Sequence, residues 1–224
     1  NAGGKAIVVA GDVTNPEFPA QLIKATLDNF GGIDIIVNNA GYTWDGVIQN
    51  MTDKQWYAML DVHTTAPFRI LREASNFIRD AAKKEQAANG RANPRKVVNV
   101  SSVSGVYGNA GQVNYSTAKA GITGLTKTMA KEWGRYNVQV NCVCYGFIET
   151  RLTAAKESAE KLQRDGEEIV LGVPDQMRQM APLLIPLGRS GTPEEAAGPM
   201  LFLASPLSNY VSGIVLEVTG GRAI

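Results

Sequence analysis

The sequence predicts an α/β fold built on a doubly wound parallel sheet. Short apolar runs rich in β-branched residues alternate with longer helical patterns, and the runs are continuous, as in strands that are covered on both faces. A succession of strand, helix and strand with right-handed crossovers forms a parallel sheet with helices on both sides. The 224 residues, 44% of them hydrophobic, are enough for one large core, so we expect a single domain over 1–224.

Five runs are expected to form the strands of this sheet. They are residues 6–10, 33–37, 96–100, 138–143 and 214–218. The first helix is expected to open at Pro16 and to end at Gly31 and Gly32, because proline favours the first helical turn and glycine the position just after the last. Two further helices are expected to begin at capping boxes, formed by Thr52 with Gln55 and by Thr192 with Glu195.

Residues 151–190 interrupt the alternation of strands and helices. The segment is charged in its first half, apolar in its second, and contains three prolines. It is long for a simple connection between two elements of a compact domain. We therefore interpret 151–190 as a lid that covers a substrate, inserted within the single domain.

Composition argues against several classes of partner. Lys and Arg total 22 against 21 Asp and Glu, and a net charge of +1 creates no field that would attract nucleic acid or an anionic membrane. No apolar run is long enough to span a bilayer, and no secretion signal is recognisable. Cys142 and Cys144 are two positions apart, too close for an easy disulfide. We expect buried free thiols in a reducing compartment, hence a cytoplasmic protein that binds a small molecule.

Polar and glycine-rich residues follow the predicted strands. The segments "GDV", "NNAG", "SSVSG" and "CYGFIET" come after the first four runs in turn. In a doubly wound sheet, ligands bind outside the carboxyl ends of the strands. The sequence therefore predicts a binding site at this edge of the sheet. No metal site is predicted, because two cysteines and the one histidine, His63, cannot complete a tetrahedral set.

The segment "YSTAKAG" is the strongest local signal for chemistry. Tyr115 and Lys119 are four residues apart on a predicted helix, which puts them on one face. We expect the ammonium to lower the pKa of the phenol, so that Tyr115 exchanges a proton near neutral pH. Ser102, thirteen residues upstream at a strand end, is positioned to hydrogen-bond the same substrate oxygen, although taken alone it reads as an ordinary turn serine.

Together these residues resemble the short-chain dehydrogenase/reductase family, in the neighbourhood of the 3-oxoacyl-carrier-protein reductases. The resemblance extends over nearly the whole chain. It is carried by "NNAG" at 38–41, by "NVSSVSGVYGNAGQVNYSTAKAGITGLTKTMAKEW" and by "NYVSGIVLEVTGG" near the end. It implies a Rossmann-like fold and an oxidoreductase that interconverts a ketone and a secondary alcohol by hydride transfer with NAD or NADP, with a 3-oxoacyl thioester as the best specific substrate.

The resemblance also implies a role for each site residue. Tyr115 is the general acid/base, Ser102 polarises the carbonyl, and Lys119 lowers the tyrosine pKa and holds the nicotinamide ribose. The implied cofactor contacts are Tyr115 and Lys119 themselves, Asp12 and Val13 at the adenine, Asn39, Ala40 and Gly41 beside the cofactor, and Ile148 and Thr150 near the nicotinamide amide. The residues that discriminate NAD from NADP in this family are not in this sequence.

A homo-oligomer, tetramer or dimer, is implied as well. One interface would involve the helices over 53–80 and 112–135, and another would lie near the final strand. Four apolar residues at helical spacing are compatible with the first interface but equally with packing inside the subunit: Phe68, Leu71, Leu125 and Met129.

The sequence departs from the family pattern in three ways. His63 stands where the family has the asparagine that is its fourth catalytic residue. Because that residue acts through its main-chain carbonyl, the resemblance implies either that histidine is tolerated here or that it adds a titrating group to the proton relay. Tyr145 replaces a proline, which loosens the backbone and could bring an aromatic ring to the nicotinamide pocket.

The third departure concerns the start of the chain. The glycine-rich turn TGxxxGxG that cradles the pyrophosphate is not found, and residues 6–10 match the family's third strand. We therefore expect either that strands one and two are missing from this sequence or that residues 1–13 pair in an unusual way. A cofactor-free scaffold or relic of the same fold is the alternative function, and an epimerase or dehydratase of the same broad family is a third.

Overall fold

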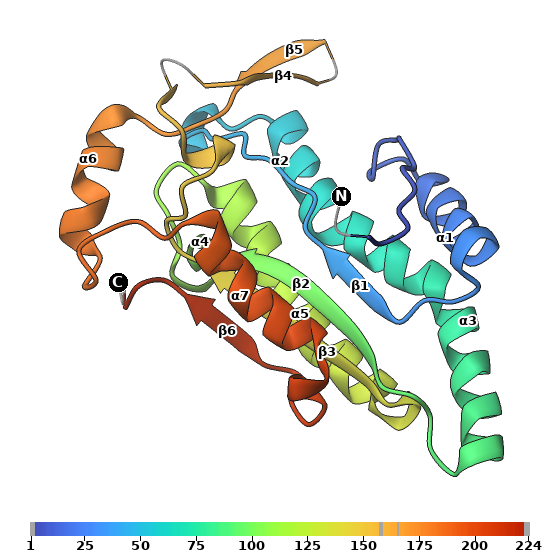
Figure 1. Ribbon diagram of the computed structural model, residues 1–224. Helices are drawn as coiled ribbons and strands as arrows, with labels where there is room; N and C mark the ends of the chain where they lie inside the picture. The colour runs from blue at the N-terminus through green and yellow to red at the C-terminus, as the bar shows by residue number, and fades with distance from the viewer. Residues whose placement is uncertain (1–2, 157–158, 165, 222–224) are drawn as a thin grey trace.

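The computed structural model describes residues 3–156, 159–164 and 166–221. Its main sheet has four parallel strands in the order β1-β2-β3-β6 (Figure 1). The strands are β1 (Ile35–Asn38), β2 (Arg95–Ser102), β3 (Val138–Tyr145) and β6 (Val215–Val218). Four of the five predicted strands are confirmed, and the parallel α/β class with them.

The prediction of a strand at 6–10 is wrong. The described part of the segment before α1 (Phe18–Phe30) contains no strand, and Val8 is 92% exposed. An apolar run becomes a strand only where a neighbour accepts its backbone hydrogen bonds. This segment lies instead against α1, where the ammonium of Lys5 donates to the carbonyl of Asn29 and lies over the ring of Phe30.

Helices cover both faces of the sheet (Figure 1). The remaining helices are α2 (Asp53–Leu60), α3 (Ala66–Asn89), α4 (Val103–Tyr107), α5 (Val113–Trp133), α6 (Asp175–Leu184) and α7 (Pro193–Ala204), with 3-10 turns at Ile48–Asn50, Gly134–Tyr136, Arg151–Thr153 and Pro206–Ser208. Both predicted capping boxes are present, and α1 ends at Gly31 in the left-handed region. α5 packs on β2 and β3 from one side and α7 packs on them from the other.

Alternate residues of the strands enter two cores. Val97 belongs to a cluster with residues of α1, α3 and α5, whereas its neighbour Val98 packs with Leu203 of α7 on the opposite face. Side chains alternate across a strand, so a continuous apolar run fills both layers. The structure therefore explains why the predicted strands are not alternating in polarity.

The four apolar residues considered for an interface divide between the core and the surface. Leu71 is 2% exposed, and Leu125 and Met129 pack against the same cluster of α1, α3 and α5. These three pack inside the subunit. Phe68 is 44% exposed and lies beside the guanidinium of Arg72.

The predicted helix over 53–80 contains a π-helical turn, Asp61–Thr65, which separates α2 from α3. The amide of Ala66 donates to the carbonyl of Asp61, five residues back. Thr64 donates its hydroxyl to the carbonyl of Ala118 on α5, which ties the wide turn to that helix. Such turns are frequent at functional sites, and this one carries His63, which is 4% exposed.

The segment 151–190 contains elements that the sequence analysis did not resolve. β4 (Lys161–Arg164) and β5 (Glu167–Val170) form an antiparallel hairpin, followed by α6. The signal was present in the Asp165-Gly166 dipeptide, which favours a two-residue hairpin turn. The hairpin packs on the body of the domain through Ile169 and Leu171.

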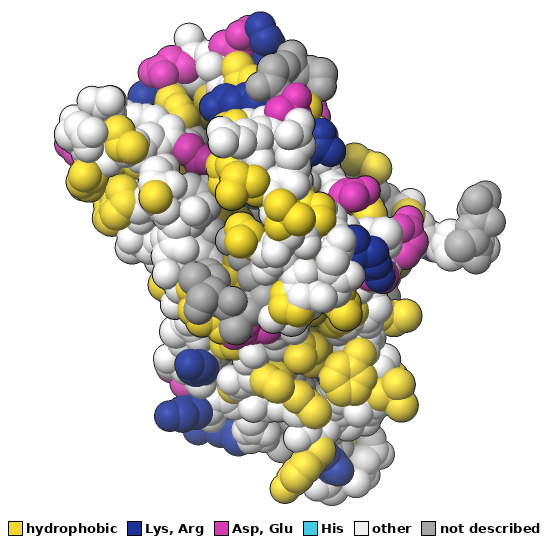
Figure 2. Space-filling view, turned by 90° about the vertical axis from the view of Figure 1, so that its left-hand side faces the viewer, with side chains coloured by type: hydrophobic (Ala, Val, Ile, Leu, Met, Phe, Trp, Pro, Cys, Tyr) yellow, Lys and Arg dark blue, Asp and Glu magenta, His cyan; other side chains and the backbone are white. Residues whose placement is uncertain are grey.

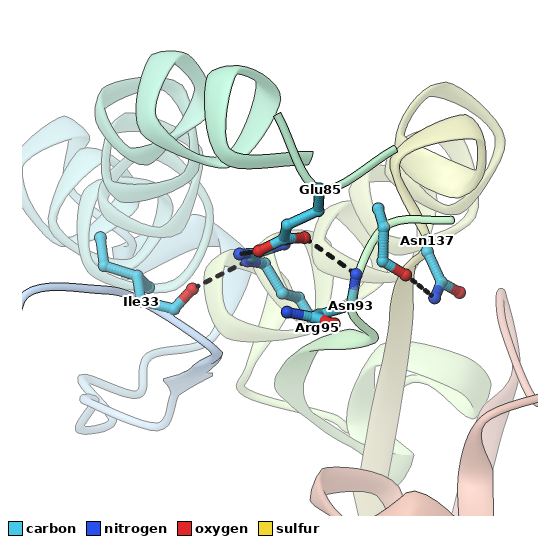
Figure 3. Close-up of polar contacts among 6 residues, drawn as sticks. Ile33, Glu85, Asn93, Arg95 and Asn137 are labelled. Atoms are coloured by element: carbon cyan, nitrogen blue, oxygen red, sulfur yellow. Dashed lines mark hydrogen bonds and ion pairs between the residues drawn. The ribbon is translucent and has the colours of Figure 1, made fainter. Parts of the chain in front are cut away.

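An ion pair at the amino end of β2 joins three elements. Arg95, at the start of β2 and 5% exposed, donates two hydrogen bonds to the carboxylate of Glu85 on α3, at 2.9 and 2.7 Å, and a third to the carbonyl of Ile33 (Figure 3). The same carboxylate accepts from the amide of Asn93. The pair therefore links α3 to both β2 and the approach to β1.

Glu85→Gln should lower the free energy of unfolding by about 2 kcal/mol, because a buried guanidinium then lacks its carboxylate. Urea denaturation at neutral pH measures this, with the exposed Glu73→Gln on the same helix as control. Arg95 lowers the pKa of Glu85, so the contribution is present above the unfolded-state pKa of about 4.3 and is lost as pH falls through the folded-state value. A difference between the two proteins that persisted fully at about pH 3 would contradict this account.

Candidate active site

The carboxyl ends of β1, β2 and β3 meet at one edge of the sheet, as the strand-end residues predicted. A cavity of about 230 Å³ opens there, and its walls include Ser102, Tyr115, Ile148 and Thr150. Leu152, Thr153, Val173 and Met177 of the 151–190 segment also line it. Four of the predicted site residues thus share one cavity, and the 151–190 segment forms part of its wall.

Ser102 and Tyr115 are brought together by the packing of α5 on β2. Ser102 is the last residue of β2 and the N-cap of α4, where its hydroxyl accepts from the amide of Ser104 at 3.2 Å. It also hydrogen-bonds the phenol of Tyr115, which lies near the start of α5. Two hydroxyl groups from different elements therefore meet at one point of the cavity wall.

Burial raises the pKa of Tyr115 to about 12, against the lowering effect of the hydrogen bond from Ser102. The expectation of a lowered pKa at Tyr115 is therefore wrong. The physical reason is that the cost of removing the phenolate from water outweighs the hydrogen bond from Ser102, and the negative charge of Asp45 raises the pKa further. Tyr115 is consequently a neutral phenol at pH 7 and can act as a proton donor.

Lys119 lies one turn after Tyr115 and is 5% exposed. Its ammonium is 5.6 Å from the centroid of the Tyr115 ring and donates to the carbonyl of Val100 on β2 at 2.8 Å. Burial lowers the pKa of Lys119 to about 8. Within the described residues this is the one hydrogen bond of the ammonium, so two of its three N–H groups are left for other acceptors.

The backbone around Lys119 is in close contact with its neighbours. The hydroxyl of Ser101 donates to the Lys119 carbonyl at 2.7 Å. A Cβ atom on Gly105 of α4 would lie 2.5 Å from the Lys119 carbonyl carbon, so only glycine permits this approach of α4 to α5. The position of the ammonium is thereby set by β2, α4 and α5 together.

His63 lies against the ring of Tyr115. Its ring meets that of Tyr115 edge-on with centroids 5.0 Å apart, and its Nε2 donates to the carbonyl of Tyr42 at 2.7 Å. Within the described residues its buried Nδ1 has no partner. Burial, together with the charge of Lys119, holds the pKa of His63 well below its usual value, so the ring is neutral.

The remaining predicted cofactor residues lie in two groups. Asn39 and Ala40 are exposed directly after β1, and Gly41 packs on the His63 ring. Asp12 and Val13 lie against the hairpin instead: Asp12 accepts from the guanidinium of Arg164, and Val13 packs against the apolar cluster of Ile169 and Leu171.

Tyr145 does not face the cavity, so the expectation of an aromatic ring there is wrong. Its hydroxyl donates to the carbonyl of Ala196 at 2.6 Å, and its ring packs with Val143 and Leu203 under α7. Alternation along β3 explains this, because residues 143 and 145 share one face. Cys142 and Cys144 occupy the other face as buried free thiols, as predicted.

One further polar pair at the cavity was not singled out in the sequence. Asp45 and Gln112 both line it, and the amide nitrogen of Gln112 lies 3.1 and 3.0 Å from the two carboxylate oxygens. Their link runs between the loop after β1 and the residue before α5. The only sequence signal was their location, since each lies a few residues from a predicted site segment.

The sequence is similar to known proteins over nearly all of its length. A family model described as enoyl-(acyl carrier protein) reductase matches residues 1–223. The chain belongs to the short-chain dehydrogenase/reductase family, whose members are NAD(P)-dependent enzymes.

Several similar proteins are 3-oxoacyl-[acyl-carrier-protein] reductases. The chain is 39% identical to the 3-oxoacyl-[acyl-carrier-protein] reductase FabG of Vibrio cholerae, over 94% of this chain and 75% of that protein. It is 38% identical to FabG of Thermotoga maritima, over 95% and 75%. It is 39% identical to the 3-oxoacyl-[acyl-carrier-protein] reductase of Synechocystis, over 99% and 78%.

Gly41→Ala should destabilise the protein by about 1–3 kcal/mol, because the new Cβ would lie 2.3 Å from Cε1 of His63. In a His63→Ala background the same change should cost much less, since the ring that obstructs it is gone. Chemical denaturation of the two single variants and the double variant measures this coupling. Strictly additive changes in the free energy of unfolding would contradict the close contact between Gly41 and the His63 ring.

Proposed function

We propose that this protein uses NAD(P)H to reduce the carbonyl of a ketone, with a 3-oxoacyl thioester as the specific substrate, and that it catalyses the reverse oxidation of the alcohol. The observation that carries the proposal is that Ser102 and Tyr115 meet at one cavity, with the ammonium of Lys119 beside the Tyr115 ring. The name shared by the relatives supports the choice of a 3-oxoacyl group. The proposal rests on this chain's own side chains as well as on its relatives.

Tyr115 is the proton donor of this scheme. The Ser102 hydroxyl and the Tyr115 phenol both hydrogen-bond the substrate carbonyl oxygen, which polarises the carbon and directs the carbonyl into the cavity. NAD(P)H, when bound, supplies the hydride that adds to the carbonyl carbon. Tyr115 transfers its proton to the oxygen, and the ketone becomes a secondary alcohol.

Lys119 stabilises the tyrosinate that remains. Its ammonium is beside the ring and its charge opposes the build-up of negative charge on the phenol oxygen as the proton leaves. Its two remaining N–H groups fit the hydroxyls of a nicotinamide ribose, which are acceptors of the kind a buried ammonium lacks here. Lys119 therefore binds the nicotinamide ribose and also stabilises the negative charge of the Tyr115 tyrosinate.

The other cofactor contacts follow the strand ends. We assign Ile148 and Thr150 to the nicotinamide amide, Asn39, Ala40 and Gly41 to the neighbouring part of the cofactor, and Asp12 and Val13 to the adenine. Asp12 is paired with Arg164 in the structure without ligands, so its contact with adenine requires that this pair rearranges. The assignment applies equally to NAD and NADP.

His63 positions the site without titrating in it. Its neutral ring supports the Tyr115 ring and fixes the loop at Tyr42 through Nε2. Its Nδ1, which has no partner among the described residues, is an acceptor for a water in the proton path that leads away from Lys119. A protonated imidazole would place a second cation beside the ammonium. We therefore assign Nδ1 of His63 an accepting role only, while Nε2 donates to Tyr42.

The segment 151–190 acts as the lid. Its residues line the cavity and its hairpin covers Tyr115 through Ile169, Leu171 and Leu162. A lid over the reacting carbonyl excludes water from the hydride transfer. It belongs to the single domain over 1–224.

The protein is proposed to act as a homo-oligomer on a small molecule in the cytoplasm. Figure 2, which looks onto the side of α6, α7 and β6, shows hydrophobic side chains across that surface. Exposed apolar residues of these elements and their connections include Leu183, Leu187, Leu201, Leu207 and Ile214. Within the described residues no helix is long and apolar enough to cross a membrane.

Two alternatives are less well supported. A cofactor-free scaffold or relic would not require the buried ammonium of Lys119 beside the buried phenol of Tyr115. Enoyl reduction is named in the description of the matching family, but two hydroxyls that converge on one point favour delivery of a proton to oxygen over reduction of a carbon–carbon double bond.

Tyr115→Phe should lower the rate of ketone-dependent NAD(P)H oxidation by at least about 100-fold, because no proton donor then faces the carbonyl oxygen. The full-length protein is assayed with a 3-oxoacyl thioester by loss of absorbance of the reduced nicotinamide. Tyr57→Phe, on the exposed face of α2, is the control and should keep full activity. Full activity of the Tyr115 variant would end the assignment of this residue.

The rate of ketone reduction should be constant at neutral pH and should fall above about pH 8. Tyr115, with a pKa of about 12, stays protonated throughout, but Lys119 loses its charge as pH rises through about 8. The pH profile of kcat tests this. In Lys119→Arg the decline should move to higher pH, because a guanidinium keeps its proton, and an unchanged decline would assign it to another group.

A further inference from the structure

We propose that Asp45 selects the substrate by charge: it rejects keto acids that carry a free carboxylate, and it accepts a hydrogen bond from an N–H or O–H group on the uncharged portion attached to the reacting acyl group. This inference rests on the proposed ketone reduction. It concerns the wall of the same cavity, on the side away from Lys119.

The charge distribution around the cavity is the first observation. Within the described residues, Asp45 is the one charged side chain in the cavity wall, which is otherwise made of polar and apolar groups. Lys119 lies behind Tyr115 and donates to the backbone of β2. The charge of Lys156 acts on Asp45 from a neighbouring pocket that both residues line, but Lys156 is not part of this wall. A carboxylate on the substrate would therefore meet a like charge and no cation in the wall itself.

The orientation of the Asp45 carboxylate is fixed by a chain of hydrogen bonds. Gln112 donates to it through Nε2. The Oε1 atom of Gln112 accepts from the hydroxyl of Ser104 at 3.0 Å and from the side-chain Nδ2 of Asn109 at 2.9 Å. These two donors leave Gln112 only one orientation, with its N–H groups toward Asp45. The negative charge of the Asp45 carboxylate is therefore held at a fixed position in the cavity wall.

The backbone of the loop is held as firmly as the side chain. The amide of Gly46 donates to the carbonyl of Gly111 at 2.8 Å, and Asn114 donates to the carbonyl of Trp44 at 3.0 Å. Gly46 and Gln112 also form an isolated parallel bridge. Asp45 is consequently attached to the first turn of α5, the helix that carries Tyr115, so carboxylate and phenol keep a constant separation.

Asp45 also has unused hydrogen-bonding capacity. Each carboxylate oxygen can accept about two hydrogen bonds, and within the described residues both are served by Gln112 alone. The side chain is exposed to the cavity, so a donor on the substrate can complete the set. Amide N–H and hydroxyl groups meet this need, whereas an ester oxygen does not.

The test uses three substrates that share one 3-oxobutanoyl group. Acetoacetate is an anion, ethyl acetoacetate is neutral without a donor, and the N-acetylcysteamine thioester is neutral with an amide N–H. In Asp45→Asn the kcat/KM for acetoacetate should rise about tenfold, mainly through KM, as the repulsion is removed. The value for the thioester should fall several-fold, and that for the ethyl ester should stay within about twofold.

Two further variants complete the design. Asp45→Glu keeps the charge and should still reject acetoacetate, while Asp80→Asn removes a charge from the exposed part of α3 and should change no ratio. Equal ratios among the three substrates in wild type and Asp45→Asn would overturn the role of Asp45 while leaving ketone reduction intact. If the wild-type protein reduces none of the three, the proposed function itself fails.

Discussion

The site depends on the burial of one ammonium group beside one phenol. Lys119 is held between β2, α4 and α5 with the carbonyl of Val100 as its acceptor, and its charge has little access to water. A buried cation is stable only if its partners are well placed. The close approach that Gly105 allows and the hydrogen bond from Ser101 to the Lys119 backbone serve this purpose. Without them the first half of α5 would not bring Tyr115 to the end of β2.

Much of this arrangement could be predicted from the sequence, because its signals are local. Continuous apolar runs identified β1, β2, β3 and β6, and their carboxyl ends identified the edge where the cavity lies. The spacing of Tyr115 and Lys119 on one helix face required only helical geometry. Ser102 could be added because a strand end and the first turn of a later helix meet at the same edge of the sheet.

The errors share a different physical origin, since each depends on what surrounds a residue. The run at 6–10 has strand-like residues, but within the described residues no strand pairs with it. The pKa of Tyr115 depends on how completely the phenol is removed from water, which spacing alone does not reveal. Tyr145 faces α7 because of its parity on β3, and the π-helical turn at His63 arises where α2 and α3 meet α5.

The packing of the β4–β5 hairpin and the pKa of Tyr115 are physically coupled. Two ion pairs tie the hairpin to the body, Arg164 to Asp12 and Lys54 to Glu167, but partly exposed pairs contribute little. The apolar cluster around Ile169 holds the hairpin more strongly, and Tyr115 is packed against that cluster. Burial is the main cause of the raised pKa of Tyr115, so displacement of the hairpin hydrates the phenol and lowers its pKa. The apolar packing that fixes the hairpin beside Tyr115 is therefore also what keeps the phenol protonated at neutral pH.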